Sequence, residues 1–326
     1  MAAKVKFYKS IKKRRAFWKD KSVVITGGNG FLGKHLIKKL NILKPRKIFL
    51  PKHSEYDFRK YNSCKKAFKN ADIVIHLAAN VGGIGYNQDH PSELFFDNMF
   101  MGINSLLAAY KNHVKKFVAI GTICSYPKFT KVPFKEEDFW NGYPEETNAP
   151  YGLAKKMQVV GSQSLNEQYG FNTINLLQVN LYGPGDNFNP KSSHVVPALI
   201  KKFVDAKKTN APYVYIWGTG KATREFLYVE DAAEGILLAT ERYNSVEPIN
   251  LGAGFEISIK ELAEKISTLT GYGGKIIWDK TRPNGQPRRM LDISKANKLF
   301  GFKAKTNFDA GLRKTINWYI KNGNSL

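Results

Sequence analysis

The sequence predicts an α/β fold: a doubly wound parallel sheet covered by helices on both faces, followed by a smaller C-terminal lobe. Two observations predict it. Over the first 180 residues, short apolar runs alternate with segments of helical periodicity. After residue 180 the chain changes to a loop rich in Gly and Pro (residues 181–190) and to shorter elements. Strands separated by helices of this length form parallel sheets with right-handed crossovers.

The predicted elements follow one another in regular alternation. Buried strands are expected at residues 21–26, 47–50, 72–77, 116–120 and 172–179. Amphipathic or apolar helices are expected from the glycines near residue 33 to about 43, over 92–112, and from 151 to about 169. Later apolar segments complete the sheet or build the smaller lobe. No internal repeat and no low-complexity segment interrupts this pattern.

Composition excludes several classes of protein. The chain has 326 residues, 43% of them hydrophobic, so it has the material for a packed core. It has two cysteines, Cys64 and Cys124, without the spacing of metal ligands, which argues against a disulfide scaffold or a metal site. No apolar run approaches the length of a membrane span. We therefore expect a protein of the cytoplasm without a bound metal.

The charge is strongly basic, because 51 Lys and Arg face 27 Asp and Glu and give a net charge of +24. A nucleic-acid binder is one interpretation. The excess is spread thinly in pairs along the chain, which favours solvated helix faces and makes nucleic acid an unlikely partner. The densest cluster, Lys12–Lys13–Arg14–Arg15 beside Phe17 and Trp18, lies in a basic arm over residues 1–20. We expect this arm to pack on the domain, while a transit peptide or a contact with RNA or a membrane surface stays open.

A glycine-rich loop follows the first predicted strand and opens the first predicted helix. Its spacing is G-x-x-G-x-x-G, with Gly27 at the tight turn, Gly30 where a phosphate would approach the backbone, and Gly33 where the helix packs on the strand. At that place a pyrophosphate meets the free N–H groups of a helix N-terminus. The loop predicts a Rossmann-type dinucleotide site whose contacts are Gly27, Gly30, Phe31, Leu32 and Gly33.

The end of the second strand indicates which dinucleotide binds. Enzymes that use NAD usually carry Asp or Glu there to hold the ribose 2′-OH. This chain has Lys52 and His53 instead, with no acid before Glu55. Cations suit a 2′-phosphate, so the sequence favours NADP(H) over NAD(H).

A catalytic pair is predicted at Tyr151 and Lys155, which lie one helical turn apart on the same face. A tyrosine has a pKa near 10 in water, and we expect the lysine ammonium to lower it enough for proton transfer at neutral pH. Thr122 follows the 116–120 strand, so its hydroxyl lies at the carboxyl edge of the sheet, where ligands of such folds gather. Thr122 is expected to hydrogen-bond the reacting carbonyl beside Tyr151.

Together these motifs resemble the extended short-chain dehydrogenase/reductase superfamily, in which Leu77, Ala78 and Ala79 also contact the cofactor. More narrowly, residues 20–320 resemble the GDP-L-fucose synthase family, the GDP-4-keto-6-deoxy-D-mannose 3,5-epimerase-4-reductases. The matching segments are residues 81–84 (VGGI), 122–127, 180–188 (NLYGPGDNF), 193–199, 217–231 and 287–292 (PRRMLD). The basic arm lies outside the resemblance.

The resemblance implies two reactions in one site. Cys124 and His194 would move the protons during epimerisation next to a keto group, and Tyr151 would then donate a proton as hydride reaches C4. Tyr151 and Lys155 would also contact the cofactor, with Lys155 holding the nicotinamide ribose. Thiol and imidazole suit this because their ordinary pKa values bracket neutral pH. The family's substrate contacts fall on Asn180, His194, Lys201 or Lys202 (Lys202 preferred), Trp217 and Arg224. A homodimer with a helix-on-helix interface is also implied.

These assignments divide the chain into the arm (residues 1–20), an NADP(H)-binding Rossmann domain (21–180), and residues 181–326, mainly a substrate-binding lobe with some elements completing the first domain. Ile123 stands where the family often has Ser, so we expect a lost sugar contact there. Three alternatives stay open. The substrate could be another GDP-linked deoxyhexose or heptose, the activity could be reduction or epimerisation alone, or a nucleic-acid binder could keep the dinucleotide fold.

Overall fold

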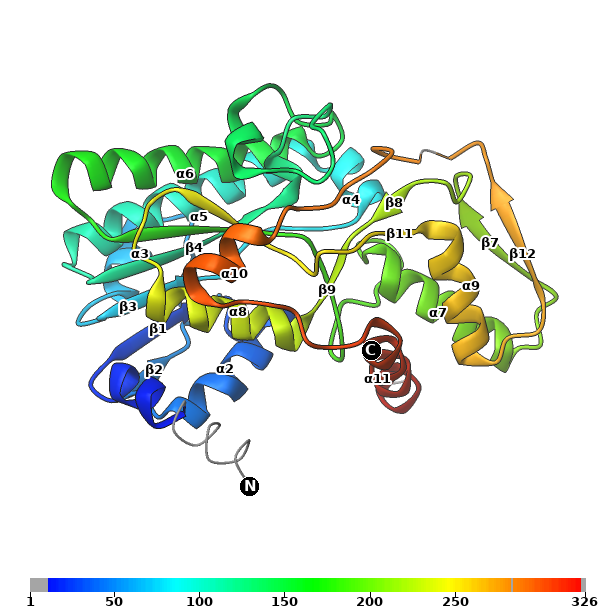
Figure 1. Cartoon of the computed structure of the whole chain (residues 1–326), viewed down its shortest axis with the longest axis horizontal. Helices are drawn as coiled ribbons and strands as arrows, with labels where there is room; N and C mark the ends of the chain where they lie inside the picture. Colours follow the sequence, from blue (N-terminus) through cyan, green and yellow to red (C-terminus); the bar gives the residue numbers. More distant parts are fainter. Residues whose placement is uncertain (1–10, 283, 324–326) are drawn as a thin grey trace.

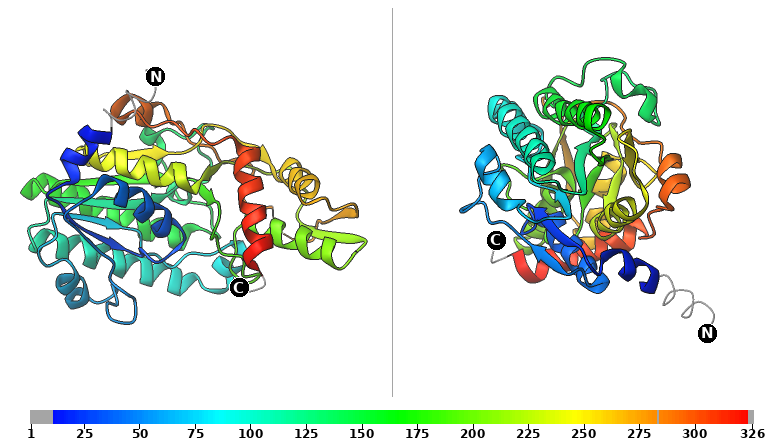
Figure 2. Two further views of the ribbon diagram at one scale, coloured as in Figure 1. Left: turned by 90° about the horizontal axis from the view of Figure 1, so that it is seen from below. Right: turned by 90° about the vertical axis from the view of Figure 1, so that its left-hand side faces the viewer.

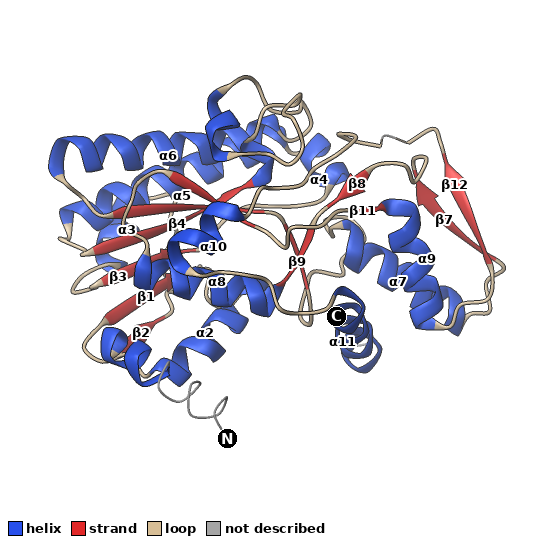
Figure 3. Cartoon of the chain, in the orientation of Figure 1, coloured by secondary structure: helices blue, strands red, loops and turns tan. Residues whose placement is uncertain are grey.

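The computed structural model describes residues 11–282 and 284–323. Its centre is a six-stranded parallel sheet in the order β10-β5-β4-β3-β1-β2, which confirms the predicted fold class (Figures 1 and 3). The strands are β1 (Ser22–Thr26), β2 (Lys47–Phe49), β3 (Ile73–His76), β4 (Lys116–Thr122), β5 (Thr173–Gln178) and β10 (Pro248–Leu251). The chain order reverses between the neighbouring strands β1 and β3, as in doubly wound sheets.

Alternation of side chains along the strands divides the core into two layers. Val23 and Ile25 of β1 pack into one layer, while Val24, between them, packs into the other. In the first layer, α2 (Phe31–Leu43) lies beside α8 (Val229–Arg242). The opposite face is covered by α3 (Tyr61–Ala67), α5 (Pro91–Lys111) and α6 (Ala149–Tyr169), as Figure 2 also shows.

The predicted helices are present with small shifts at their ends. The third begins at Ala149, two residues before the predicted start, with Pro150 in its first turn, where a missing N–H costs no hydrogen bond. It ends at Tyr169 and is followed by the C-capping Gly170, whose φ of 65° suits glycine. The short α4 (Ile84–Asp89) and two 3₁₀ helices, Ile123–Ser125 and Glu136–Trp140, were not predicted.

A second core builds the smaller lobe at the right of Figure 1. Its elements are α7 (Val195–Lys208), β7 (Tyr213–Trp217), α9 (Ile259–Thr270), β12 (Lys275–Asp279) and α11 (Phe308–Asn322). Two short pairs, β6 (Asn180–Tyr182) with β9 (Phe226–Tyr228) and β8 (Thr223–Arg224) with β11 (Ile257–Ser258), lie between the lobe and the sheet. After β12, residues 284–292 run back toward the sheet and lead to α10 (Ser294–Phe300). This helix packs on α8.

The described part of the basic arm packs on α8, as predicted. Residues 11–18 are helical, and Trp18 is fully buried with its Nε1 donating to Glu241 at 2.8 Å. Arg14 donates to Glu241 at 2.9 Å and to Glu234 at 2.6 Å. Residues 1–10 lie outside the described residues. Among the described helices, none has the length and apolar character needed to cross a membrane.

Candidate active site

The glycine loop between β1 and α2 packs so closely on neighbouring backbone that two of its positions cannot hold a side chain. A Cβ on Gly33 would overlap the carbonyl oxygen of Gly28, and Gly27 has a φ of 66°, with Ala78 N only 2.9 Å from where its Cβ would lie. The first turn of α2 carries no acidic residue, so its N-terminal dipole is not neutralised. The loop therefore fits the pyrophosphate of a dinucleotide.

The predicted segment Leu77–Ala79 lies against this loop at the end of β3. Thr26 joins the two strands: its carbonyl accepts from Leu77 N at 3.2 Å, and its hydroxyl accepts from Ala78 N at 3.1 Å. The Thr26 hydroxyl can then donate its own proton to Nδ1 of the buried His76, which lies 2.9 Å from Oγ1. Burial lowers the pKa of His76 to about 3, so this histidine is neutral. Thr26 and His76 were not predicted from the sequence.

Lys52 and His53 are both exposed just after β2, in a turn where Lys52 O accepts from Glu55 N at 3.0 Å. Phe31 and Leu32, in the first turn of α2, are partly buried. These predicted cofactor residues thus follow the carboxyl ends of β1, β2 and β3, three neighbouring strands of the sheet, while the predicted cofactor contacts Tyr151 and Lys155 lie on α6.

Tyr151 and Lys155 lie together on α6, with Lys155 Nζ 6.0 Å from the centre of the tyrosine ring. Burial lowers the pKa of Lys155 to about 8. The pKa of Tyr151 is raised, chiefly by burial and further by Cys124. This corrects the expectation that Lys155 lowers it, because loss of hydration penalises the phenolate more than the partly desolvated ammonium stabilises it. Tyr151 is therefore a protonated phenol at neutral pH.

The end of β4 packs directly against the first turn of α6. Ser125 Oγ donates to Gly152 O at 2.8 Å, and a Cβ on Gly152 would overlap the carbonyl oxygen of Cys124. Thr122 accepts from Cys124 N through its Oγ1 at 3.1 Å, so its own hydroxyl proton can be donated elsewhere. Thr122, Cys124 and Tyr151 are thus brought to one place, as predicted.

Polar side chains from two other segments surround the Cys124 sulfur. Arg289 Nη1 donates to Cys124 Sγ at 3.4 Å, and Sγ donates to Asn148 Oδ1 at 3.7 Å. Glu145, just before α6, accepts from Asn148 and lies 3.6 Å from Arg289. Asn148, Glu145 and Arg289 were not predicted; Arg289 lies in the PRRMLD motif but received no role.

His194 immediately precedes α7, and the segment before it packs on the VGGI motif. Gly83 N donates to Ser192 O at 3.1 Å, and a Cβ on Gly83 would overlap the carbonyl oxygen of Ser193. Burial lowers the pKa of His194, which favours the neutral imidazole. Asn87 of α4, whose N donates to Gly83 O at 3.0 Å, donates through Nδ2 to Asn148 at 3.2 Å. The same loop therefore connects His194 with the Cys124 cluster.

Arg224 lies nine-tenths buried beside this cluster. Its Nη1 donates to Thr223 O at 2.7 Å and its Nη2 to Asn284 O at 3.3 Å. Its pKa is lowered to about 10, by burial first and then by the neighbouring Arg289. Glu145 is the acidic side chain that interacts with both guanidinium groups. Two buried cations near one carboxylate leave excess positive charge for an anionic ligand such as a diphosphate.

The remaining predicted substrate residues lie toward β7. Lys202 Nζ donates to Tyr215 O at 2.7 Å, whereas Lys201 donates to Asp205 at 2.8 Å and to Tyr319 of α11 at 3.1 Å. The structure therefore favours Lys202 over Lys201 at this edge. Trp217 is 47% exposed, with the guanidinium of Arg282 5.1 Å from its ring centre. Asn180 begins β6 and is partly buried.

Comparison with known proteins agrees with this geometry. The model of the NAD dependent epimerase/dehydratase family matches residues 23–252. The chain belongs to this family. GDP-L-fucose synthase 1 of Arabidopsis thaliana is 37% identical over 306 residues, 93% of this chain and 94% of that protein. This confirms the resemblance to GDP-L-fucose synthases and the prediction of an enzyme.

Solved structures of the same type superpose closely. A GDP-L-fucose synthetase from Naegleria fowleri bound to NADP has a TM-score of 0.85 at 29% identity, covering 94% of this chain and 96% of its own. A GDP-6-OMe-4-keto-L-xylo-heptose reductase from C. jejuni also has a TM-score of 0.85, at 28% identity, covering 93% and 98%.

One expectation drawn from the family resemblance is wrong. Ile123 was expected to face the sugar in place of a serine, but its side chain is only 3% exposed and belongs to the main core under the sheet. The 3₁₀ turn over Ile123–Ser125 points Ile123 inward and leaves the neighbouring Cys124 partly exposed. Position 123 therefore contributes a side chain to the core of this chain and not to the lining of the site.

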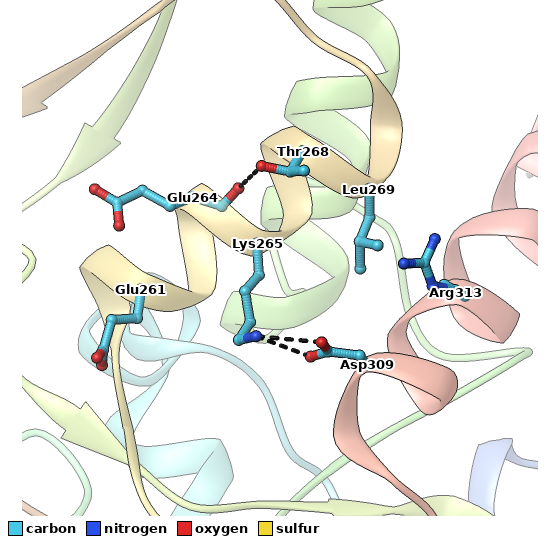
Figure 4. Close-up of a pocket in the computed structure, with 7 residues that line it drawn as sticks. All are labelled: Glu261, Glu264, Lys265, Thr268, Leu269, Asp309 and Arg313. Carbon is cyan, nitrogen blue, oxygen red and sulfur yellow. Dashed lines mark hydrogen bonds and ion pairs between the residues drawn. The ribbon is translucent and has the colours of Figure 1, made fainter.

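An open groove between α9 and α11 lies in the smaller lobe (Figure 4). It contains none of the predicted catalytic residues. Its charges are partly paired, since Lys265 lies 3.0 Å from Asp309. Among the described residues, no group of His, Cys, Asp and Glu is arranged to hold a metal ion.

Proposed function

We propose that this protein is an NADPH-dependent epimerase-reductase that converts GDP-4-keto-6-deoxy-D-mannose to GDP-L-fucose. One observation carries the proposal: a thiol, Cys124, lies beside a protonated phenol, Tyr151, at the carboxyl end of β4, with the buried Arg224 and Arg289 next to them. The thiol suits proton abstraction next to a keto group, the phenol suits reduction of that group, and the two cations suit a diphosphate. The Arabidopsis relative carries the corresponding name.

Epimerisation needs one group to remove a proton and another to return it on the opposite face. We assign these tasks to Cys124 and His194, which approach the site from β4 and from the start of α7. The 4-keto group acidifies the protons at C3 and C5, because the electron pair left by each proton is delocalised onto the keto oxygen. Hydrogen bonds from Tyr151 and Thr122 stabilise that oxygen.

Reduction uses the same keto oxygen. NADPH, when bound, supplies the hydride to C4. Tyr151 donates its phenolic proton to the oxygen, and its raised pKa keeps that proton in place at neutral pH until the alkoxide forms. The Lys155 ammonium stabilises the phenolate that remains.

The cofactor site fits NADP(H). The glycine loop admits the pyrophosphate. The Naegleria structure, which holds NADP, supports this choice. Asn180, Lys202, Trp217 and Arg224 are proposed to hold the sugar, the phosphates and the base.

The test is to incubate the purified protein with NADPH and GDP-4-keto-6-deoxy-D-mannose in D₂O and to analyse the product by NMR. Oxidation of NADPH with deuterium at both C3 and C5 is the expected result. Failure to oxidise NADPH and to exchange either proton would contradict the proposal.

A second candidate is a 4-keto reductase for a GDP-linked heptose. It is favoured by the C. jejuni heptose reductase, whose TM-score equals that of the Naegleria synthetase. The same experiment separates the two, because a reductase oxidises NADPH without placing deuterium at C3 or C5.

We also propose a homodimer formed through α5 and α6. These helices pack together and expose the apolar side chains of Phe96, Phe100, Leu107, Met157 and Val160, which range from 38% to 48% exposed. A two-fold axis would pair this face with its copy. Light scattering should give twice the chain mass for the wild type and the single mass for Phe100→Glu. A monomeric wild type would contradict this assignment.

A further inference from the structure

The sulfur of Cys124 is held between one hydrogen-bond donor and one acceptor. Arg289 Nη1 donates to it at 3.4 Å, while the thiol itself donates to Asn148 Oδ1 at 3.7 Å. A guanidinium donor favours the thiolate, and a carbonyl acceptor favours the thiol. The two contacts act in opposite directions, as suits a group that is deprotonated before a proton transfer and protonated after it.

Glu145 decides which atom of Asn148 faces the thiol. The Glu145 side chain is 7% exposed and accepts from Asn148 Nδ2 and from Thr147 Oγ1. Because an ionised carboxylate only accepts hydrogen bonds, Asn148 must turn its NH₂ toward Glu145. Its Oδ1 is then directed to Cys124 and to Asn87 Nδ2.

The same carboxylate supports Arg289. Arg289 is also 7% exposed, its Nη2 lies 3.6 Å from Glu145, and its Nε donates to Gln286 at 2.6 Å. The backbone around it is fixed as well, since Leu291 N donates to the buried Glu225 at 2.7 Å. A buried charge without its partner is strongly unfavourable, so Glu145 and Arg289 depend on each other.

We propose that the buried Glu145–Arg289 pair is a positioning device for Cys124, which sets both hydrogen-bond partners of its sulfur. The inference rests on the proposed function. In the epimerisation step, the Cys124 thiolate takes a proton from the carbon next to the keto group and becomes S–H, and the C–H electron pair moves into the enolate. Arg289 stabilises the charge on sulfur before the transfer, and Asn148 accepts the new S–H afterwards. Among the described residues, the titratable groups Tyr151 and Arg224 also interact electrostatically with Cys124.

The sequence supplies a matched control for each member of the pair. Glu146 follows Glu145 but is exposed and pairs with Lys128 at 2.8 Å. Arg288 precedes Arg289 but is exposed and pairs with Glu256. Glu146→Gln and Arg288→Met therefore remove the same charges from neighbouring positions without touching Cys124.

The first measurement is the rate at which iodoacetamide alkylates Cys124 in the full-length protein at pH 7, followed by mass spectrometry. Arg289→Met should slow alkylation by about tenfold, because the thiolate loses its cation. Arg289→Lys should restore most of the rate, and Arg288→Met should stay within about twofold of the wild type. Cys64 should remain unlabelled, since burial raises its pKa to about 11. Wild-type labelling of Arg289→Met, or equal slowing in Arg288→Met, would overturn the inference.

The second measurement compares deuterium incorporation with NADPH oxidation on GDP-4-keto-6-deoxy-D-mannose. Glu145→Gln should lower the ratio of incorporation to oxidation by about tenfold, whereas Glu146→Gln should leave it unchanged. An unchanged ratio in Glu145→Gln would contradict the inference. If the wild type shows neither reaction, the proposed function fails, and alkylation still decides whether the pair controls the thiol. Thermal melting of each variant identifies any that do not fold.

Discussion

The cofactor side and the sugar side of this site are built in different ways. The cofactor side consists of turns directly after three neighbouring strands, β1, β2 and β3, and its main requirement is the absence of side chains at Gly27 and Gly33. On the sugar side, Cys124, Glu145, His194, Arg224 and Arg289 come from five segments of the chain. The comparison shows that the glycine loop is determined by residues close together in the sequence, whereas the cluster of buried charges forms only when distant segments of the chain meet in the fold.

Tyr151→Phe should have the largest effect, because it removes the proton that the reduced oxygen needs. We expect NADPH oxidation to fall by roughly 10²–10⁴-fold while NADPH affinity changes little. Stopped-flow turnover and fluorescence titration measure the two separately. Full turnover in the variant would show that the sugar side does not depend on this phenol.

Cys124→Ala should affect only the proton exchange on the sugar side. Deuterium incorporation at C3 and C5 should fall by roughly 10²-fold or more, the usual contribution of a positioned base, while some direct 4-keto reduction persists. NMR of the product in D₂O measures both. Normal product stereochemistry would remove Cys124 from the mechanism.

Gly33→Ala tests the cofactor side by adding one methyl group where the backbone of Gly28 lies. Overpacking of this kind typically costs about 1–3 kcal/mol, so we expect a lower melting temperature and NADPH binding weaker by tenfold or more. Gly273→Ala is the matched control, since nothing lies within 4 Å of its Cβ position. Equal melting temperatures and NADPH affinities in the two variants would contradict the close packing of this loop.

The pH dependence tests the lysine that connects the two sides. Burial lowers the pKa of Lys155 to about 8, so its ammonium is present below that pH and is lost as the pH rises through it. We expect kcat/KM for NADPH-dependent reduction to fall above pH 8. In Lys155→Arg the alkaline fall should move to higher pH, because a guanidinium stays protonated. An identical alkaline limb in both proteins would assign it to another group.

Lys52→Ala should have the smallest effect, because Lys52 is exposed and its charge is screened by solvent. We expect NADPH affinity to fall by about three- to tenfold, with NADH affinity unchanged. Isothermal titration with both dinucleotides measures the difference. If the affinities for NADPH and NADH fell equally, Lys52 would not contact the 2′-phosphate.

The sequence alone predicted the parallel sheet, its two helical layers and the cofactor loop. Each depends on short-range patterns, such as the alternation that sends Val23 and Ile25 to one core and Val24 to the other. Tyr151 and Lys155 were predictable for the same reason, because one helical turn brings them together. The segments containing Cys124, His194 and Arg224 were found through family motifs.

Only the tertiary structure decided how these groups interact. In the folded chain Ile123 is buried in the core, and burial raises the pKa of Tyr151 where a lower pKa was expected. The fold also brings Glu145 next to Arg289, 144 positions away in the sequence, beside the Cys124 thiol. No local pattern distinguishes Glu145 from Glu146 or Arg289 from Arg288. The fold buries one member of each pair and exposes the other, and burial decides which charges act on the site.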